Sequence, residues 1–205
     1  MMIGGIDEAG RGPLLGPMVI AGYFVEDEHV LRRLSEVVTR DSKGYTPAAR
    51  RRIYDWLLSL EGGTAITVTI HPSIIDAWVG LLGGLNQMEA YFYSLVIRRA
   101  SPRVVYVDSC DPNPRRFEER IRMYAPGVEV RAEIGADARY PIVAAASIVA
   151  KVIRDEYIAR LRREYGEVGS GYPSDPRTKA FFEEWVRRTG FKPPFARKTW
   201  RVGVP

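Results

Sequence analysis

The pattern of apolar and polar positions predicts a chain that opens with strands. Met2, Ile3 and Ile6 run into Asp7, which predicts a strand over about residues 2–7, and a second apolar run follows at 18–25. Because a bend rich in glycine and proline joins them, we expect a hairpin-like pair. Further strands are predicted at 64–70, from its β-branched residues, at 104–108, an apolar run typical of a central strand, and at 128–134.

Helical spacing of apolar residues fills most of the remaining chain. The segments that show it are 26–38, 47–60, 74–99 with a break near Gly83-Gly84, 116–124, 141–166 and 177–189. Thr46-Pro47 is typical of a helix start, with a capping threonine and proline in the first turn. Strands first and then strands alternating with helices predict an α/β fold, a mixed sheet covered by helices.

Length and composition limit the function classes. At 205 residues we expect one domain, 1–205, whose last part is a small appendage. No apolar run reaches the roughly 20 residues that span a bilayer, and no signal sequence opens the chain, so we expect a cytoplasmic protein. Cys110 is the only cysteine, which excludes an intramolecular disulfide and a cysteine zinc site, and the two histidines lie far apart, so we expect no histidine-rich metal centre. A metal site would therefore consist of carboxylates, which favours magnesium or manganese.

The charge balance favours an anionic partner. The formal net charge is +5, although many basic proteins bind nothing acidic. Arginine supplies 25 of the 30 basic residues, and glutamine and asparagine are scarce. This composition is typical of a thermophilic source, or of genome composition alone.

The candidate chemistry begins at the end of the first strand, in Gly5-Ile6-Asp7-Glu8-Ala9-Gly10-Arg11-Gly12-Pro13. Side chains on a strand alternate between faces, so Asp7 and Glu8 share one face only if the strand ends or bends there. Adjacent carboxylates repel each other unless a cation lies between them. Glycines on both sides of Arg11 leave backbone N–H groups and one guanidinium open to a polyanion. The pattern indicates a metal next to nucleic acid.

Two further acids fit the same site. Asp108 closes an apolar strand, and Asp137 precedes the long helix that starts at Pro141. Carboxylates at neighbouring strand ends can converge, and four of them could hold two divalent ions about 4 Å apart for phosphodiester hydrolysis. Each acid also has a structural explanation: Asp108 as a turn former and Asp137 as an acid favoured by the helix dipole.

The order of motifs resembles the ribonuclease HII family over nearly the whole chain, its archaeal members in particular. The matching motifs are Ile6 to Pro13 with Gly16-Pro17, Asp41-Ser42-Lys43, Tyr106-Val107-Asp108, Ala144 to Ile148 with Ala150-Lys151, and Gly169 to Pro176. The resemblance implies an RNase H-like fold, a five-stranded mixed sheet flanked by helices, with a helical C-terminal extension over about 166–205 that helps bind substrate. It also implies cleavage of the RNA strand of RNA/DNA hybrids.

The same resemblance implies roles for individual residues. Asp7, Glu8, Asp108 and Asp137 match the acids that bind catalytic Mg²⁺ or Mn²⁺. The Gly10-Arg11-Gly12 loop matches the segment that reads the ribose 2′-OH through its backbone, and Tyr172 the tyrosine that packs on the following deoxyribose. Lys43 resembles a phosphate contact, although Gly44-Tyr45 follows where the family often has a second lysine. Cleavage 5′ of single ribonucleotides embedded in duplex DNA, leaving 3′-OH and 5′-phosphate ends, is implied as well.

Some alternatives stay open. The fold and metals would also suit a DNA junction resolvase, and a duplex-binding module with structural acids would need no metal. Lys151 could face substrate or lie on a helix surface, and Trp200 could contact nucleic acid or fold back on the protein. Val202 to Pro205 carry no sliding-clamp motif, so we expect no clamp binding, and we expect a monomer involved in DNA replication and repair.

Overall fold

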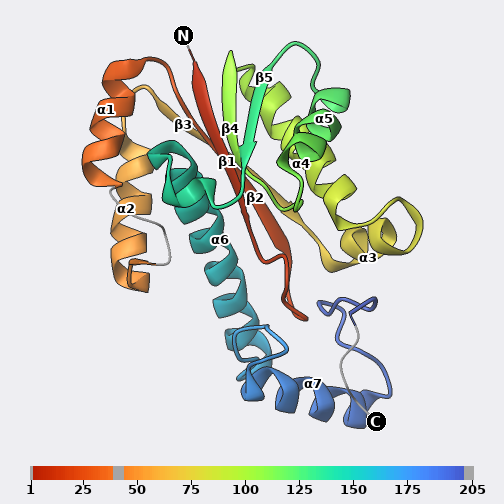
Figure 1. Cartoon of the computed structure of the whole chain (residues 1–205). Helices are drawn as coiled ribbons and strands as arrows, with labels where there is room; N and C mark the ends of the chain where they lie inside the picture. The colour runs from red at the N-terminus through yellow and green to blue at the C-terminus, as the bar shows by residue number, and fades with distance from the viewer. Residues whose placement is uncertain (1, 39–43, 201–205) are drawn as a thin grey trace.

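A mixed five-stranded sheet lies at the centre of the molecule (Figure 1). The computed structural model describes residues 2–38 and 44–200. The sheet order is β3-β2-β1-β4-β5, and β1 pairs antiparallel with β2 and parallel with β4. The strands are β1 (Ile3–Ala9), β2 (Met18–Val25), β3 (Gly63–Ile70), β4 (Val104–Asp108) and β5 (Glu129–Glu133). The predicted hairpin and mixed sheet are confirmed.

Local sequence signals mark where the helices begin. The Thr46 hydroxyl accepts a hydrogen bond from Ala49 N–H at the start of α2, as its position before Pro47 predicts. His71 caps α3, because its ring nitrogen accepts a hydrogen bond from the Ser73 N–H. The helices are α1 (Glu28–Val37), α2 (Pro47–Ser59), α3 (Pro72–Leu81), α4 (Leu85–Ala100), α5 (Pro114–Tyr124), α6 (Pro141–Tyr165) and α7 (Pro176–Thr189), with a 3₁₀ turn, η2 (Ala136–Ala138), ahead of α6.

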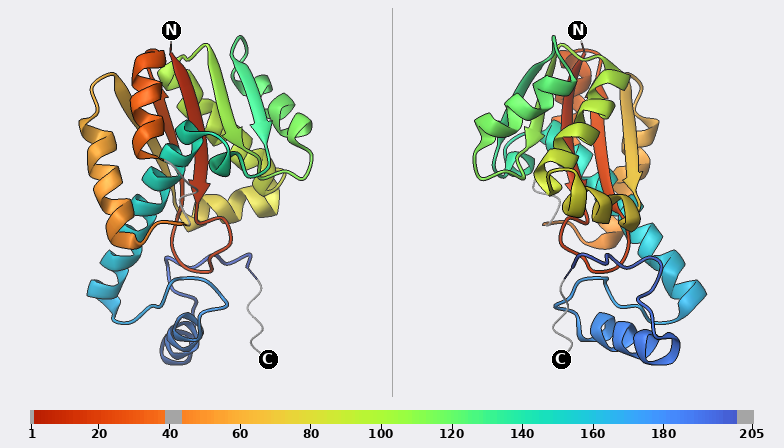
Figure 2. Two further views of the ribbon diagram at one scale, coloured as in Figure 1. Left: turned by 60° about the vertical axis from the view of Figure 1, so that its left-hand side comes forward. Right: turned by 90° about the vertical axis from the view of Figure 1, so that its right-hand side faces the viewer.

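Alternate residues of β2 enter two different cores. Val19, Ala21 and Tyr23 pack in a cluster with α1, α2 and α6, whereas Ile20 and Phe24 pack in a cluster with α3, α4 and α5. The sheet is therefore covered on both faces, as Figures 1 and 2 show. Full burial on both sides explains why the strand is apolar at every position except Gly22.

The C-terminal part forms a third apolar cluster below the sheet (Figure 2). Leu14 and Leu15, from the bend between β1 and β2, pack in this cluster with the end of α6, α7 and Phe195. The N–H groups of both leucines donate to the Gly171 carbonyl at 2.8 and 3.0 Å. The bend that follows Asp7 and Glu8 is thus held by residues more than 150 positions away in the sequence.

None of the helices in the described part of the chain combines the length and hydropathy needed to cross a bilayer.

Candidate active site

Three aspartates meet at one edge of the sheet. Asp7 on β1, Asp108 at the end of β4 and Asp137 in η2 each offer a carboxylate oxygen, and the three oxygens lie within 4.8 Å of one another. Because β1 and β4 are parallel neighbours, their carboxyl ends share an edge. The Asp108 carboxylate also accepts a hydrogen bond from Ala136 N–H at 2.8 Å, which holds the turn carrying Asp137 against β4.

Glu8 is not part of this group, and the strand geometry explains why. We expected β1 to end or bend at the two acids, but it continues to Ala9, so their side chains leave on opposite faces. Asp7 lies toward α6, where Ser147 is a hydrogen-bond partner. Glu8 lies toward α4, where the Tyr93 hydroxyl donates to Glu8 Oε2 at 2.5 Å. Both residues still line the same cavity.

The acids are electrostatically disfavoured where they lie. Burial raises the pKa of the Asp7 carboxyl well above its ordinary value, and the charges of Glu8 and Asp108 raise it further. Burial also raises the pKa of Glu8 to about 7, with a contribution from the buried Glu89. A nearby positive charge would stabilise the ionised forms, so this crowding is what a cation site requires.

A cavity of about 350 Å³ collects most of the residues singled out from the sequence. It is lined by Asp7, Glu8, Asp108 and Asp137 from the acidic edge, by Gly10, Arg11 and Gly12 from the loop, by Tyr172 from the C-terminal part, and by Ala9, Arg50, Lys151, Arg154 and Asp155. Lys43 lies outside the described residues. Because Lys151 is among the lining residues, it faces the cavity and does not lie on an outer helix surface. Its ammonium donates to the Ser147 hydroxyl at 2.6 Å.

The Arg11 guanidinium is oriented differently from our expectation. Instead of lying open to a polyanion, Nη2 donates to the Asn86 side chain at 2.6 Å, and Nε lies 3.3 Å from the buried carboxylate of Glu89. Nη1 donates to the Cys110 carbonyl at 3.4 Å. The side chain thus ties the loop to α4 and to the segment after β4, and the loop offers its backbone to the cavity.

The two glycines of this loop differ in what the fold requires of them. Gly10 has φ of +88°, and a Cβ there would lie 2.6 Å from the Pro17 carbonyl oxygen. Any larger residue would therefore strain the bend. At Gly12 a Cβ would meet only the Tyr172 ring, at an ordinary 3.7 Å. The protein itself therefore has room for a methyl group at Gly12.

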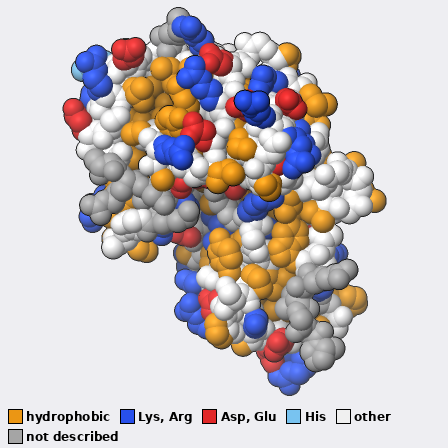
Figure 3. Space-filling model, viewed as in Figure 1, with side chains coloured by type: hydrophobic (Ala, Val, Ile, Leu, Met, Phe, Trp, Pro, Cys, Tyr) orange, Lys and Arg blue, Asp and Glu red, His pale blue; other side chains and the backbone are white. Residues whose placement is uncertain are grey.

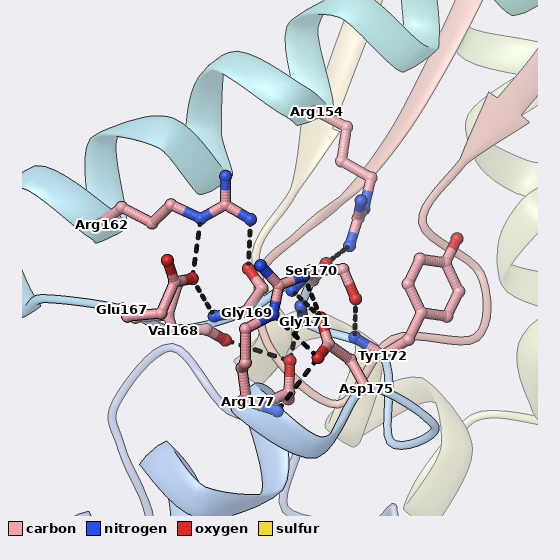
Figure 4. A network of polar contacts seen from close by, with 11 residues as sticks. Arg154, Arg162, Glu167, Val168, Gly169, Ser170, Gly171, Tyr172, Asp175 and Arg177 are labelled. Carbon is pink, nitrogen blue, oxygen red and sulfur yellow. Dashed lines mark hydrogen bonds and ion pairs between the residues drawn. The ribbon is translucent and has the colours of Figure 1, made fainter.

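A rigid turn presents Tyr172 beside the loop (Figure 4). Asp175 accepts hydrogen bonds from the N–H groups of Ser170 and Arg177, and the Gly171 N–H donates to Thr178. Arg154 of α6 donates to the Ser170 carbonyl at 3.0 Å, and its guanidinium carbon lies 5.0 Å from the centre of the Tyr172 ring. Tyr172 is nevertheless 39% exposed. This arrangement holds an aromatic ring open at the rim of the cavity.

Sequence reasoning missed some residues of the site. Arg50 and Arg154 line the cavity, yet both lie in helices where an arginine normally faces solvent. The three-residue spacing from Lys151 to Arg154 places both on one side of α6, and this spacing was the available signal. Trp200 follows the second of the two alternatives, because it folds back and its ring N–H donates to the Gly12 carbonyl at 3.2 Å.

Comparisons with known proteins agree with this geometry. The family model described as Ribonuclease HII matches residues 4–202. A protein named Ribonuclease HII from Pyrococcus abyssi is 44% identical over 203 residues, covering 98% of this chain and 88% of that protein. The crystal structure of the ribonuclease H2 from Pyrococcus horikoshii OT3 superposes with a TM-score of 0.90 at 41% identity, covering 98% of this chain and 95% of that one.

A second solved structure is that of the PCNA:RNase HII complex from Archaeoglobus fulgidus. It has a TM-score of 0.88 and 36% identity, covering 100% of this chain and 98% of that one. The fold is therefore the RNase H-like fold expected from the motifs. The family match, the acidic strand ends and the matched fold lead to one conclusion: this chain belongs to the ribonuclease HII family, and it is a type 2 ribonuclease H hydrolase.

Proposed function

We propose that this enzyme hydrolyses the RNA strand of RNA/DNA hybrids and also cuts 5′ of single ribonucleotides embedded in duplex DNA, leaving 3′-OH and 5′-phosphate ends. One observation carries the proposal. The three aspartates that lie within 4.8 Å of one another share a cavity with the Gly10–Gly12 loop and with Tyr172. Groups suited to hydrolysis and groups suited to recognising a sugar are thus adjacent.

The acids fit a divalent metal. Asp7, Asp108 and Asp137 would supply hard oxygen ligands, which Mg²⁺ and Mn²⁺ prefer, and the raised pKa of Asp7 reflects a crowding that a cation would relieve. When bound, such ions activate water and stabilise the leaving oxygen of a phosphodiester. Glu8, on the other face of β1 but on the same cavity wall, would act as the fourth acid.

The loop and the tyrosine would select the substrate. Within the described part of the chain, the N–H groups of Arg11 and Gly12 donate to no protein acceptor, so they are available to a ribose 2′-OH. The 2′-OH is the feature that separates RNA from DNA at a given site. Tyr172 would pack on the following deoxyribose, and in this way the C-terminal extension (about 166–205) helps bind substrate. Lys43 would contact a phosphate.

Several sequence-based predictions go with this proposal. We expect the enzyme to act as a monomer in the cytoplasm, in DNA replication and repair. The Archaeoglobus fulgidus RNase HII forms a complex with PCNA. For this chain we expect no clamp binding, because residues 202–205 carry no clamp motif.

The decisive experiment uses two duplexes of the same sequence, one with a single ribonucleotide and one all DNA. In Mg²⁺ we expect one cut, 5′ of the ribonucleotide, and none in the control. Asp7→Asn removes one charged ligand but keeps the shape, so cleavage should fall at least about 10³-fold while binding of the hybrid persists. Cleavage of the all-DNA duplex or of a four-way junction would identify a DNA nuclease instead. Unchanged behaviour of Asp7→Asn would identify a binding module.

A further inference from the structure

The segment 195–200, which we call the C-terminal strap, binds the three consecutive carbonyl groups of the Gly10–Gly12 loop. Arg197 is fully buried, and its guanidinium donates to the carbonyls of Arg11 (2.6 Å), Gly10 and Gly16 (3.4 Å). Trp200 donates to the next carbonyl, that of Gly12, and its ring lies 4.8 Å from the guanidinium carbon of Arg197. Three consecutive loop carbonyls are thus held by two side chains of the strap.

Holding these carbonyls fixes the direction of the loop N–H groups. All described peptide bonds are trans, and in a trans peptide the C=O and N–H bonds point in opposite directions. Because Arg197 binds the Gly10 and Arg11 carbonyls, the N–H groups of Arg11 and Gly12, which belong to the same two peptide units, point away from Arg197. Arg11 and Gly12 both line the cavity, and their N–H groups donate to no protein acceptor in the described residues.

The strap is itself anchored, so it does not simply follow the loop. Asp76 of α3 accepts hydrogen bonds from the backbone N–H groups of Lys198 and Thr199, each at 2.9 Å, and from the Thr199 hydroxyl at 2.6 Å. On the other side, the Arg197 N–H donates to the Leu14 carbonyl at 2.9 Å. Arg197 is therefore fixed from both directions.

The environment of Arg197 is unusual for a purely structural arginine. Burial lowers its pKa to about 10, and the nearby charge of Arg154 adds to this effect, yet the group stays protonated at neutral pH. Among residues 2–38 and 44–200 no carboxylate lies within 4.0 Å of it, and its Nε has no hydrogen-bond partner. A buried charge without an ion-pair partner is costly. The hydrogen bonds to the loop carbonyls offset this cost, which argues that the orientation of these carbonyls matters.

We infer that Arg197 is a positioning residue for 2′-OH recognition, holding two peptide units so that their N–H groups meet the ribose. The inference rests on the proposed function. It assigns part of the substrate selectivity to a side chain that touches no substrate and lies 186 residues from Arg11 in the sequence.

The test measures selectivity rather than activity. In an Asp7→Asn background, which binds without cutting, fluorescence anisotropy gives the Kd for the one-ribonucleotide duplex and for its all-DNA counterpart. The selectivity ratio is the Kd for the all-DNA duplex divided by the Kd for the one-ribonucleotide duplex. This ratio does not depend on the fraction of folded protein. We expect Arg197→Met, which keeps the length but loses every donor, to lower the ratio about tenfold toward one.

Two further variants complete the design. Lys192→Met removes one positive charge and the hydrogen bond from Lys192 to the Lys198 carbonyl but leaves the contacts of Arg197 in place, so its ratio should equal that of the parent. If Arg197→Met does not fold, Arg197→Lys decides, because one ammonium cannot reproduce the planar fork, and its ratio should fall between the other two. A parental ratio near one would overturn both the proposed 2′-OH recognition and this inference. A parental ratio above one that neither Arg197 variant lowers would overturn this inference alone.

Discussion

Gly12 shows how a single residue separates the requirements of the fold from those of the site. A methyl group there meets only the Tyr172 ring, at an ordinary distance. We therefore expect Gly12→Ala to change the free energy of unfolding by no more than about 0.5 kcal/mol. The methyl would nevertheless occupy space beside the loop N–H groups, so cleavage of the one-ribonucleotide duplex should fall about 10²-fold. Thermal unfolding and single-turnover rates measure the two effects separately.

Gly10→Ala is the matched comparison for this prediction. Its positive φ and the close Pro17 carbonyl mean that both stability and cleavage should fall. If Gly12→Ala cuts the ribonucleotide duplex at the normal rate, then the substrate does not approach the loop backbone closely.

Asp111, in contrast to Gly12, is expected to matter for stability. It is buried behind the site, and its carboxylate accepts hydrogen bonds from Arg116, Arg120 and Asn86. These donors, those of Arg116 first, hold the pKa of Asp111 well below its usual value. The stability that Asp111 provides is therefore present above the unfolded-state pKa near 4 and is lost as the pH falls through the lower folded-state pKa.

Asp111→Asn should then destabilise the protein by about 2 to 4 kcal/mol at pH 7. The difference from the parent should shrink as the pH falls below about 4. Urea unfolding at pH 7, 5 and 3 measures it. A difference that stayed constant over this range would mean that the Asp111 charge contributes nothing to stability.

At the scale of elements, the contact between α6 and β1 positions the acids. Gly5 allows this contact, because a Cβ there would lie 2.4 Å from the backbone of Ile142 in the first turn of α6. Gly5→Ala should push the helix away from the strand and cost about 1 to 3 kcal/mol of stability. Ser147 and Lys151 lie further along the same helix, so cleavage should fall as well.

Gly80→Ala is the control for this substitution. Gly80 lies in α3, and a methyl group added there would have nothing within 4 Å, so alanine should stabilise the protein by about 0.5 to 1 kcal/mol without affecting cleavage. Denaturant unfolding of both variants measures the contrast. Equal stability changes would show that α6 tolerates displacement from β1.

The elements could be predicted largely from local sequence, whereas the directions of key side chains could not. Proline and capping residues mark most helix starts, and the run at 18–25 is apolar because both of its faces are buried. The opposite faces of Asp7 and Glu8 depend on where β1 ends, which pairing with β2 decides. The contacts of Arg11 and Arg197 join segments that are distant in sequence. The local pattern of apolar and polar residues therefore could not predict them.

At the scale of the whole molecule, the site exists only where separate parts of the chain meet. The β1–β4 edge supplies Asp7 and Asp108, the η2 turn ahead of α6 supplies Asp137, and the C-terminal part supplies Tyr172. Figure 3 shows basic side chains scattered over one face of the molecule among acidic ones. On that face (Figure 3) the basic side chains form no single large patch, so we expect the groups of the cavity to position a duplex there.

Stability of the whole molecule should depend on divalent metal, because like charges repel one another in the acidic cluster. In EDTA, Asp7→Asn removes one of the crowded carboxylates, so its Tm should exceed that of the parent by about 2 to 4 °C, which corresponds to roughly 1 kcal/mol in a chain of this size. Mg²⁺ at ten times its Kd should stabilise the parent by about 1.4 kcal/mol. Asp7→Asn should gain much less, so the order of the two Tm values reverses.

Differential scanning calorimetry in EDTA and in Mg²⁺ tests this reversal, with NaCl of matched ionic strength as the control for general screening. Burial first, and then the charges of Glu8 and Asp108, disfavour the ionised Asp7 in the folded protein, so we expect the carboxylate to lower stability without metal and to raise it when a cation is bound. If Asp7→Asn were less stable than the parent in EDTA, the carboxylate would be a structural group, and its proposed role as a metal ligand would lose its electrostatic basis.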